Sequence, residues 1–261
     1  CDQERLTIID RDESQLATIV VRYDGPLPHN CKSYDQVITD GLANNLTPEA
    51  IQAVLAGVII DAYDEAMIMF TSGTSGKPKA ALFTHFNCCQ AMINFEAVGA
   101  VAYMTNTEAY SKHIAKGVPS KALITVPLFH VSGLFAQFLL TLRGGRTLVL
   151  MYKWDPDEAC DIMIREKITI VVAAPSMLLD LTQHSKFKNV DTSIISNISG
   201  AGAATPSKLA KLLIEKLPNS LPGSGWGMTE TGAAGSSFTG YFYNLKLGSC
   251  GFVNPIVDLS F

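Results

Sequence analysis

The 261-residue sequence predicts an α/β fold in which parallel-rich sheets are flanked by helices. Short β-branched runs alternate along the chain with stretches whose apolar residues recur at helical spacing. That alternation is typical of parallel strands joined by helices. In addition, 48% of the residues are apolar and only 17% are charged. A chain of this length and composition buries a sizeable core, which excludes disorder as its main state.

The first hundred residues predict a strand, a helix, a second strand and a second helix. The β-branched run 17–23 is typical of a buried strand. Thr47 followed by Pro48 predicts a helix start, because the hydroxyl can cap the helix and proline suits its first turn. The residues that recur on one face of this helix are Ile51, Val54, Leu55 and Val58. The run 66–70 predicts the next strand, and a helix capped by Thr84 follows.

The same alternation continues through the rest of the chain. Strands are predicted over 121–127, 146–151, 168–174 and 193–199. Helices are predicted over 131–142, from Asp155 through Met163, and from Thr205 to Leu217. Residues 104–120 are polar and mixed, so we expect a loop there.

The stretch 122–142 contains no charged residue and is long enough to raise the question of a membrane span. The residues that interrupt its apolar character are Pro127, His130, Ser132, Gly133 and Gln137. A buried strand, a turn and an apolar helix explain the stretch better, so we expect no transmembrane segment.

Charge and cysteine usage argue against several classes of protein. Twenty Lys and Arg against 24 Asp and Glu give a net charge of −4, the opposite of the balance in a non-specific nucleic-acid binder. The six cysteines include no C-x-x-C pair, which argues against a zinc site and a disulfide scaffold. Reduced cysteines and the lack of a signal peptide predict an intracellular, cytoplasmic protein. Because the chain begins with Cys1, we expect it to be a piece of a longer protein.

The strongest local signal is the loop TSGTSGKPKA (71–80), directly after the strand at 66–70. Its glycines allow close backbone approach to a ligand, and its amides, hydroxyls and lysines suit polyphosphate. The residues expected to hold phosphate are Thr71, Ser72, Gly73, Thr74, Ser75, Gly76, Lys77 and Lys79. Composition alone does not distinguish this loop from a flexible surface linker. It does not match GxxxxGK[ST], since Pro78 stands where Ser or Thr is required, which argues against a P-loop NTPase.

The string FTSGTSGKPKAALFTH (70–85) resembles the signature of the adenylate-forming superfamily, which includes acyl-CoA synthetases and peptide-synthetase adenylation domains. Further blocks follow in that family's order, namely VPLFHVSGL (126–134), SGAGAATPSKL (199–209), GSGWGMTETG (223–232) and KLGSCGFVNP (246–255). The resemblance implies that residues 64–261 are the core of an AMP-binding domain. Residues 1–63 would be its N-terminal part and carry no recognised motif.

The resemblance implies ATP, Mg²⁺ and coenzyme A as participants in the reaction. Glu230 matches the family's magnesium carboxylate, and oxygen ligands of this kind suit Mg²⁺. Thr229 matches the residue that contacts the α-phosphate, and Trp226 matches the aromatic residue that packs on adenine. The positions that match the nucleotide and adenylate site are Gly202, Ala203, Ser224, Gly225, Trp226 and Gly227.

His130 lies in the block that matches the family's acyl-pocket gate. A histidine in an apolar stretch is more often a locally paired core residue, but the surrounding block resembles acyl-CoA synthetases. The implied function is ATP-dependent activation of a fatty or aryl acid, followed by thioester formation with coenzyme A. An amino-acid adenylation domain of a peptide synthetase and a non-catalytic nucleotide-binding module remain alternatives.

Three parts of the family's machinery lie beyond the last residue of this sequence. They are the aspartate that holds the ribose, a hinge, and the small C-terminal lid domain with its lysine. We therefore expect the chain by itself to be inactive. We also expect the surface after Phe261 either to mediate dimerisation or to leave an unordered C-terminal tail.

Overall fold

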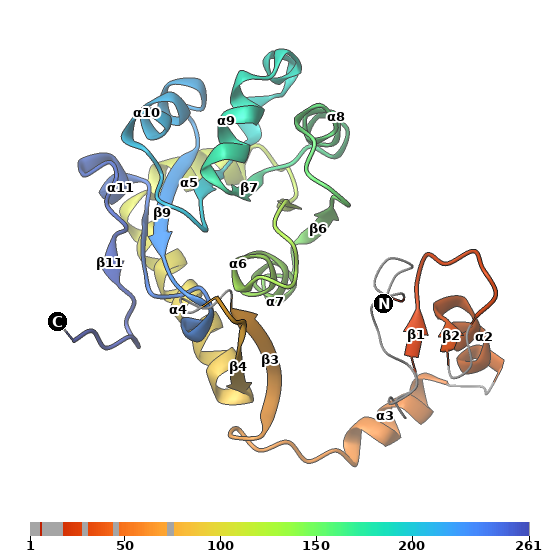
Figure 1. The fold of residues 1–261 in the computed structure, drawn as a ribbon. Coiled ribbons are helices and arrows are strands. Elements are labelled where there is room, and N and C mark those ends of the chain that lie inside the picture. Colours follow the sequence, from red (N-terminus) through yellow and green to blue (C-terminus); the bar gives the residue numbers. More distant parts are fainter. Residues whose placement is uncertain (1–5, 7–17, 28–30, 44–46, 72–75, 261) are drawn as a thin grey trace. The chain divides into compact units, whose positions relative to one another are not determined.

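The computed structural model describes residues 6, 18–27, 31–43, 47–71 and 76–260. These belong to two compact units, Cys1–Ile60 and Asp61–Phe261 (Figure 1).

The first unit contains two short strands and two helices within its described residues. Strand β1 (Thr18–Val20) pairs in parallel with β2 (Cys31–Ser33), and α2 (Tyr34–Ala43) and α3 (Pro48–Ala56) follow. The predicted helix start is confirmed, because the Thr47 hydroxyl accepts a hydrogen bond from the Ala50 amide at 3.2 Å. The apolar face of α3 is exposed, however, and the helix ends before Val58.

The second unit is built on a seven-stranded sheet whose order among the described strands is β11-β10-β9-β8-β7-β5-β6. The parallel strands are β5 (Lys121–Ile124), β6 (Thr147–Leu150), β7 (Ile170–Ala173), β8 (Asn197–Gly200) and β9 (Leu221–Trp226). The antiparallel strands are β10 (Ser236–Thr239) and β11 (Phe252–Val253). The predicted α/β fold with parallel-rich sheets is confirmed.

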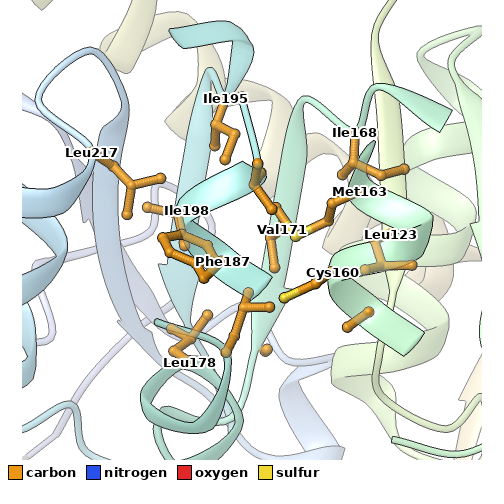
Figure 2. Packing of buried hydrophobic residues seen from close by; sticks show 14 of the residues in the cluster. Leu123, Cys160, Met163, Ile168, Val171, Leu178, Phe187, Ile195, Ile198 and Leu217 are labelled. Carbon is orange, nitrogen blue, oxygen red and sulfur yellow. The ribbon is translucent and has the colours of Figure 1, made fainter. Parts of the chain in front are cut away.

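One face of this sheet packs against α8 (Pro156–Glu166), α9 (Pro175–Gln183) and α10 (Ser207–Lys216). Figure 2 shows Val171 and Ile198 of the sheet clustered with Met163 of α8 and Leu178 of α9. The Asp155 carboxylate caps α8 by accepting hydrogen bonds from two backbone amides, at 2.8 and 3.2 Å. Short 3₁₀ turns, η2 (Ser185–Asn189) and η3 (Thr192–Ile194), connect α9 to β8.

Helices α4 (His85–Thr105) and α5 (Thr107–Ala115) lie on the other side of the sheet. The expectation of a loop over 104–120 is therefore wrong for most of that stretch. Helix α5 is polar and has little apolar periodicity, so the sequence did not predict it. Hydrogen bonds to distant parts of the chain keep it in place. The His113 ring donates to the Asn219 carbonyl at 2.6 Å, and the Lys116 ammonium donates to the Ser193 carbonyl.

The helix predicted over 131–142 consists of three segments. They are α6 (Val131–Gly133), the π-helical turn η1 (Leu134–Leu139) and α7 (Leu140–Arg143). Throughout the described ranges, the helices are too short or too polar to cross a bilayer.

A separate antiparallel hairpin joins β3 (Glu65–Thr71) to β4 (Lys79–Thr84). Its buried face packs on α4 through Met69 and Phe83. The hydroxyl of Thr84 caps α4 by accepting from the Asn87 amide, and the Asn87 side chain accepts from the Thr84 amide in return. The C-terminal part adds η4 (Thr229–Thr231) and α11 (Tyr241–Leu245).

Candidate functional site

A cavity of about 790 Å³ lies against the sheet face opposite α8 and α9. Successive side chains of a strand point to opposite faces, and the sequence uses this alternation. In β8, for example, Ile198 is buried in the core cluster, whereas Asn197 and Ser199 line the cavity. Helices α4 and α5 and the α6–α7 segments complete its wall.

The carboxyl ends of the parallel strands bring several predicted site residues into this cavity. His130 follows β5, Gly202 follows β8, and Trp226 ends β9. The predicted residues that line the cavity are His130, Gly202, Ser224, Gly225, Trp226, Gly227 and Thr229. Ligands of open α/β sheets bind outside the carboxyl ends of the strands, so this end is the candidate binding site.

Trp226 presents an aromatic face at this end. A Cβ built on Gly235 would lie 2.5 Å from the Trp226 ring, so the ring lies directly over that glycine. The residue is nevertheless 45% exposed. A Cβ on Gly227 would lie 2.3 Å from the Ala233 carbonyl oxygen, closer than any side chain can approach. This tight backbone packing fixes the position of Trp226 and leaves ring surface available to a planar ligand.

Thr229 and Glu230 stand on the tight turn η4. The Met228 amide donates to the Thr231 hydroxyl at 3.1 Å, and Gly232 ends the turn at a φ of 58°. A Cβ on Gly232 would lie 2.7 Å from the Ala91 Cβ, so the turn is seated directly on α4. Thr229 lines the cavity, whereas the exposed Glu230 does not.

Glu230 suits one kind of metal site. Across the part of the chain that the structure describes, no group of three or more His, Cys, Asp or Glu could enclose a metal ion. Magnesium is commonly held by one or two carboxylates together with substrate phosphates and water. An exposed carboxylate beside the cavity therefore fits a metal that arrives with a nucleotide.

The predicted phosphate loop is the tip of the β3–β4 hairpin. Ser72, Gly73, Thr74 and Ser75 lie outside the described residues. At its two ends Thr71 pairs with Lys79 in the strand register, and Gly76 has a φ of 80°. Lys77 and Lys79 are exposed, and strand β3 lies beside η4.

Six predicted residues within the described ranges do not line the cavity. Thr71, Gly76, Lys77 and Lys79 belong to the hairpin, Glu230 stands on η4, and Ala203 is exposed after Gly202. Gly202 has a φ of 80° with no atom near its missing Cβ, so its backbone conformation, rather than crowding, requires glycine there.

The cavity also contains residues that the sequence analysis did not select. Tyr110 and Arg146 line it at the amino ends of the strands, and Gln137 lines it from η1. Gln137 is only 3% exposed and accepts from the Thr125 amide at 3.4 Å, while its Nε2 has no partner among the described residues. Gln137 could have been identified from the sequence, because it is a polar residue within the uncharged stretch 122–142. Tyr110 could not, because it lies in the stretch 104–120 that was expected to be a loop.

The fold matches that of two solved structures. The N-terminal domain of FACL13 from Mycobacterium tuberculosis has a TM-score of 0.68 at 20% identity, covering 91% of this chain and 57% of that one. O-succinylbenzoate coenzyme A synthetase from Bacillus subtilis, solved in complex with ATP and magnesium ion, has a TM-score of 0.64 at 22% identity. That match covers 97% of this chain and 47% of that one. The fold is thus that of the N-terminal domain of acyl-CoA synthetases.

The family model of the AMP-binding enzymes matches residues 3–260, and the chain belongs to this family. It is 28% identical to 4-coumarate–CoA ligase 3 of Arabidopsis thaliana over 253 residues. This match covers 96% of the chain and 40% of the relative, so the chain spans less than half the length of that relative. The family match also includes the N-terminal residues that carry no recognised motif.

Proposed function

We propose that the protein containing this chain activates a carboxylic acid with ATP and transfers the acyl group to coenzyme A. The observation that carries this proposal is the meeting of His130, Gly202, Trp226 and Thr229 in one cavity at the carboxyl ends of the parallel strands. The acid is expected to be fatty or aryl. Similarity to a 4-coumarate–CoA ligase supports the aryl class.

The reaction has two displacement steps. A carboxylate oxygen of the acid attacks the α-phosphorus of ATP, the bond from that phosphorus to the bridging oxygen of the β-phosphate breaks, and pyrophosphate leaves. The sulfur of coenzyme A then attacks the acyl carbon, and AMP leaves with the carboxyl oxygen that joined it to the acyl group. The thiol proton passes to solvent or a base.

The described residues suit the first step. The free surface of Trp226 would stack on adenine, and the Thr229 hydroxyl would donate to an α-phosphate oxygen. Lys77 and Lys79 would balance charge on the β- and γ-phosphates. Glu230 would hold Mg²⁺, which when bound neutralises charge on the phosphate oxygens.

His130 is suited to orient the acid. It follows the turn after β5 and occupies the N-cap position of α6 without a capping bond from its side chain, and its ring lies 4.7 Å from the Phe129 ring. Gly133 holds this turn close, because a Cβ there would lie 2.3 Å from the Pro127 carbonyl oxygen. A histidine held at this position of the backbone, with no capping bond from its ring, is free to hydrogen-bond the carboxylate as it approaches the nucleotide.

The test is acid-dependent exchange of pyrophosphate into ATP by the full-length protein, with aryl, fatty and amino acids in the panel. Glu230→Gln should reduce the exchange rate by about 10²-fold or more, because it removes a carboxylate ligand of the Mg²⁺ that would neutralise charge on the phosphates. Glu215→Gln, on the exposed side of α10, is the matched control and should leave the rate unchanged.

Different results would point to the alternatives. Exchange with amino acids alone would indicate a peptide-synthetase adenylation domain. ATP binding without exchange for any acid would indicate a non-catalytic nucleotide-binding module. A Glu230→Gln protein with normal turnover at ordinary Mg²⁺ would remove that residue from the metal site.

A further inference from the structure

The cavity extends beyond the nucleotide end to the opposite, amino ends of the parallel strands. Ser120 and Thr169, which immediately precede β5 and β7, line this distal end. So do Tyr110 and Lys116 of the α5 region and Arg146, which precedes β6. None of these residues has a role in the steps proposed above.

Arg146 is exposed and lines the distal end of the cavity, where its guanidinium is accessible to a ligand. A Cβ on Gly144 would lie 3.1 Å from the Arg146 Nε, so the start of the guanidinium lies over that glycine. Among the described residues no carboxylate is within ion-pair distance of Arg146. By contrast, Arg143 forms an ion pair with Glu96, which also lines this cavity, so the Glu96 carboxylate is neutralised.

Tyr110 adds a hydrogen-bond donor beside this cation. Burial raises the pKa of its hydroxyl above the ordinary value, and the neighbouring Arg146 charge opposes this shift. The hydroxyl therefore stays protonated and available to donate. Lys116 and His113 tie α5 to the carbonyls of Ser193 and Asn219, which holds this wall of the cavity in place.

We propose that Arg146 and Tyr110 bind a second anionic group on the acid, so that the substrates are acids with a carboxylate remote from the reacting one. This proposal rests on the proposed function. A guanidinium offers a planar fork of donors that matches a carboxylate, and such charge-assisted pairs are stronger than neutral hydrogen bonds. The alternative is a solvated surface arginine beside a packing tyrosine.

The geometry sets the separation of the two acidic groups. Ser120 at the distal end and Thr125 after β5 are five residues apart. At about 3.3 Å per residue, Ser120 and Thr125 are roughly 16 Å apart, which is the length of strand that runs beside the cavity. The reach of the arginine side chain shortens the gap that the acid must span. Short dicarboxylates should therefore fail to bridge it, and longer ones should succeed.

The experiment measures pyrophosphate exchange by the full-length protein with matched acid pairs. Succinate, adipate, suberate and sebacate are compared with butanoate, hexanoate, octanoate and decanoate. The longer dicarboxylates should be preferred over their monocarboxylate partners. Arg146→Gln should raise KM for suberate about tenfold to a hundredfold and leave octanoate unaffected. Unchanged turnover of octanoate also shows that the variant folds.

Three further variants separate the roles. Arg146→Lys should retain part of the preference for dicarboxylates that Arg146→Gln loses, because it keeps the positive charge. Tyr110→Phe should weaken the binding of suberate but not of octanoate, because it removes the hydroxyl and keeps the ring. Arg165→Gln, on α8 at the opposite face of the sheet, should change nothing. Equal use of both acids by the unmodified protein, or equal losses for both in Arg146→Gln, would overturn this proposal and leave the proposed function standing.

Calorimetry with suberate in the absence of ATP distinguishes the two failures. Binding of suberate that is lost in Arg146→Gln supports the distal site even if no acid undergoes exchange. Absence of suberate binding to the unmodified protein overturns the distal site, whatever the exchange assay shows.

Discussion

Replacing Trp226 tests the nucleotide end of the cavity. The ring lies over Gly235 and is 45% exposed, so truncation to alanine removes a stacking surface without breaking a buried hydrogen bond. Base stacking on an aromatic side chain contributes about 1–3 kcal/mol, and each 1.4 kcal/mol changes an affinity tenfold. Trp226→Ala should therefore raise the Kd for ATP by about 5- to 150-fold. Trp226→Phe keeps a smaller ring and should have a smaller effect.

Two measurements check this expectation. Calorimetry gives the ATP affinity of each variant. Tryptophan fluorescence reports stacking directly, because the chain has only two tryptophans. The second, Trp154, packs against the core cluster on the other face of the sheet. The ATP-dependent fluorescence change should vanish in Trp226→Phe and persist in Trp154→Phe.

Two outcomes would refute the reasoning about Trp226. One is an ATP affinity that alanine leaves unchanged. The other is a fluorescence change that survives in Trp226→Phe and disappears in Trp154→Phe. Circular dichroism of each variant establishes that the fold is retained.

Two further predictions concern the core. Leu178→Ala removes a side chain with no exposed surface, so it should lower the free energy of unfolding, measured by urea denaturation, by about 2–5 kcal/mol. Leu179→Ala is the control, because its side chain is 37% exposed, and it should lower the free energy of unfolding clearly less. Equal losses in the two variants would contradict the packing in Figure 2. Burial, with the carboxylates of Asp157 and Asp161, raises the pKa of the Cys160 thiol to about 11. The thiol should therefore favour the folded state below the unfolded pKa near 9, and this contribution should fall as the pH rises towards 11. The loss of unfolding free energy over that range should be smaller in Cys160→Ala, and an unchanged slope would count against the prediction.

Local chemistry explains why much of the fold could be predicted. A helix cap involves groups only two or three residues apart, so Thr47, Thr84 and Asp155 could be assigned from sequence, and their bonds are present. Burial on one side of α8 follows from the i, i+3, i+4 spacing of Ala159, Ile162 and Met163, which are 0%, 4% and 1% exposed.

The candidate site was predictable where it coincides with family motifs. His130, Trp226 and Thr229 were selected because their blocks resemble those of adenylate-forming enzymes, and all three line the cavity. Their roles toward the nucleotide and the acid remain predictions. Motif matching could not show that Glu230 and Lys77 stand outside the cavity wall.

The residues that the sequence did not reveal depend on contacts between distant parts of the chain. Periodicity shows which side of β8 is apolar, but it does not show that β5 lies between β7 and β6. That pairing places Arg146, at the start of β6, at the distal end of the same cavity. Helix α5 is polar and depends on hydrogen bonds to Ser193 and Asn219, so its amino acids alone do not predict it. The motifs predict which residues lie at the carboxyl ends of the strands, whereas strand order and long-range hydrogen bonding determine which residues lie at the opposite end of the cavity.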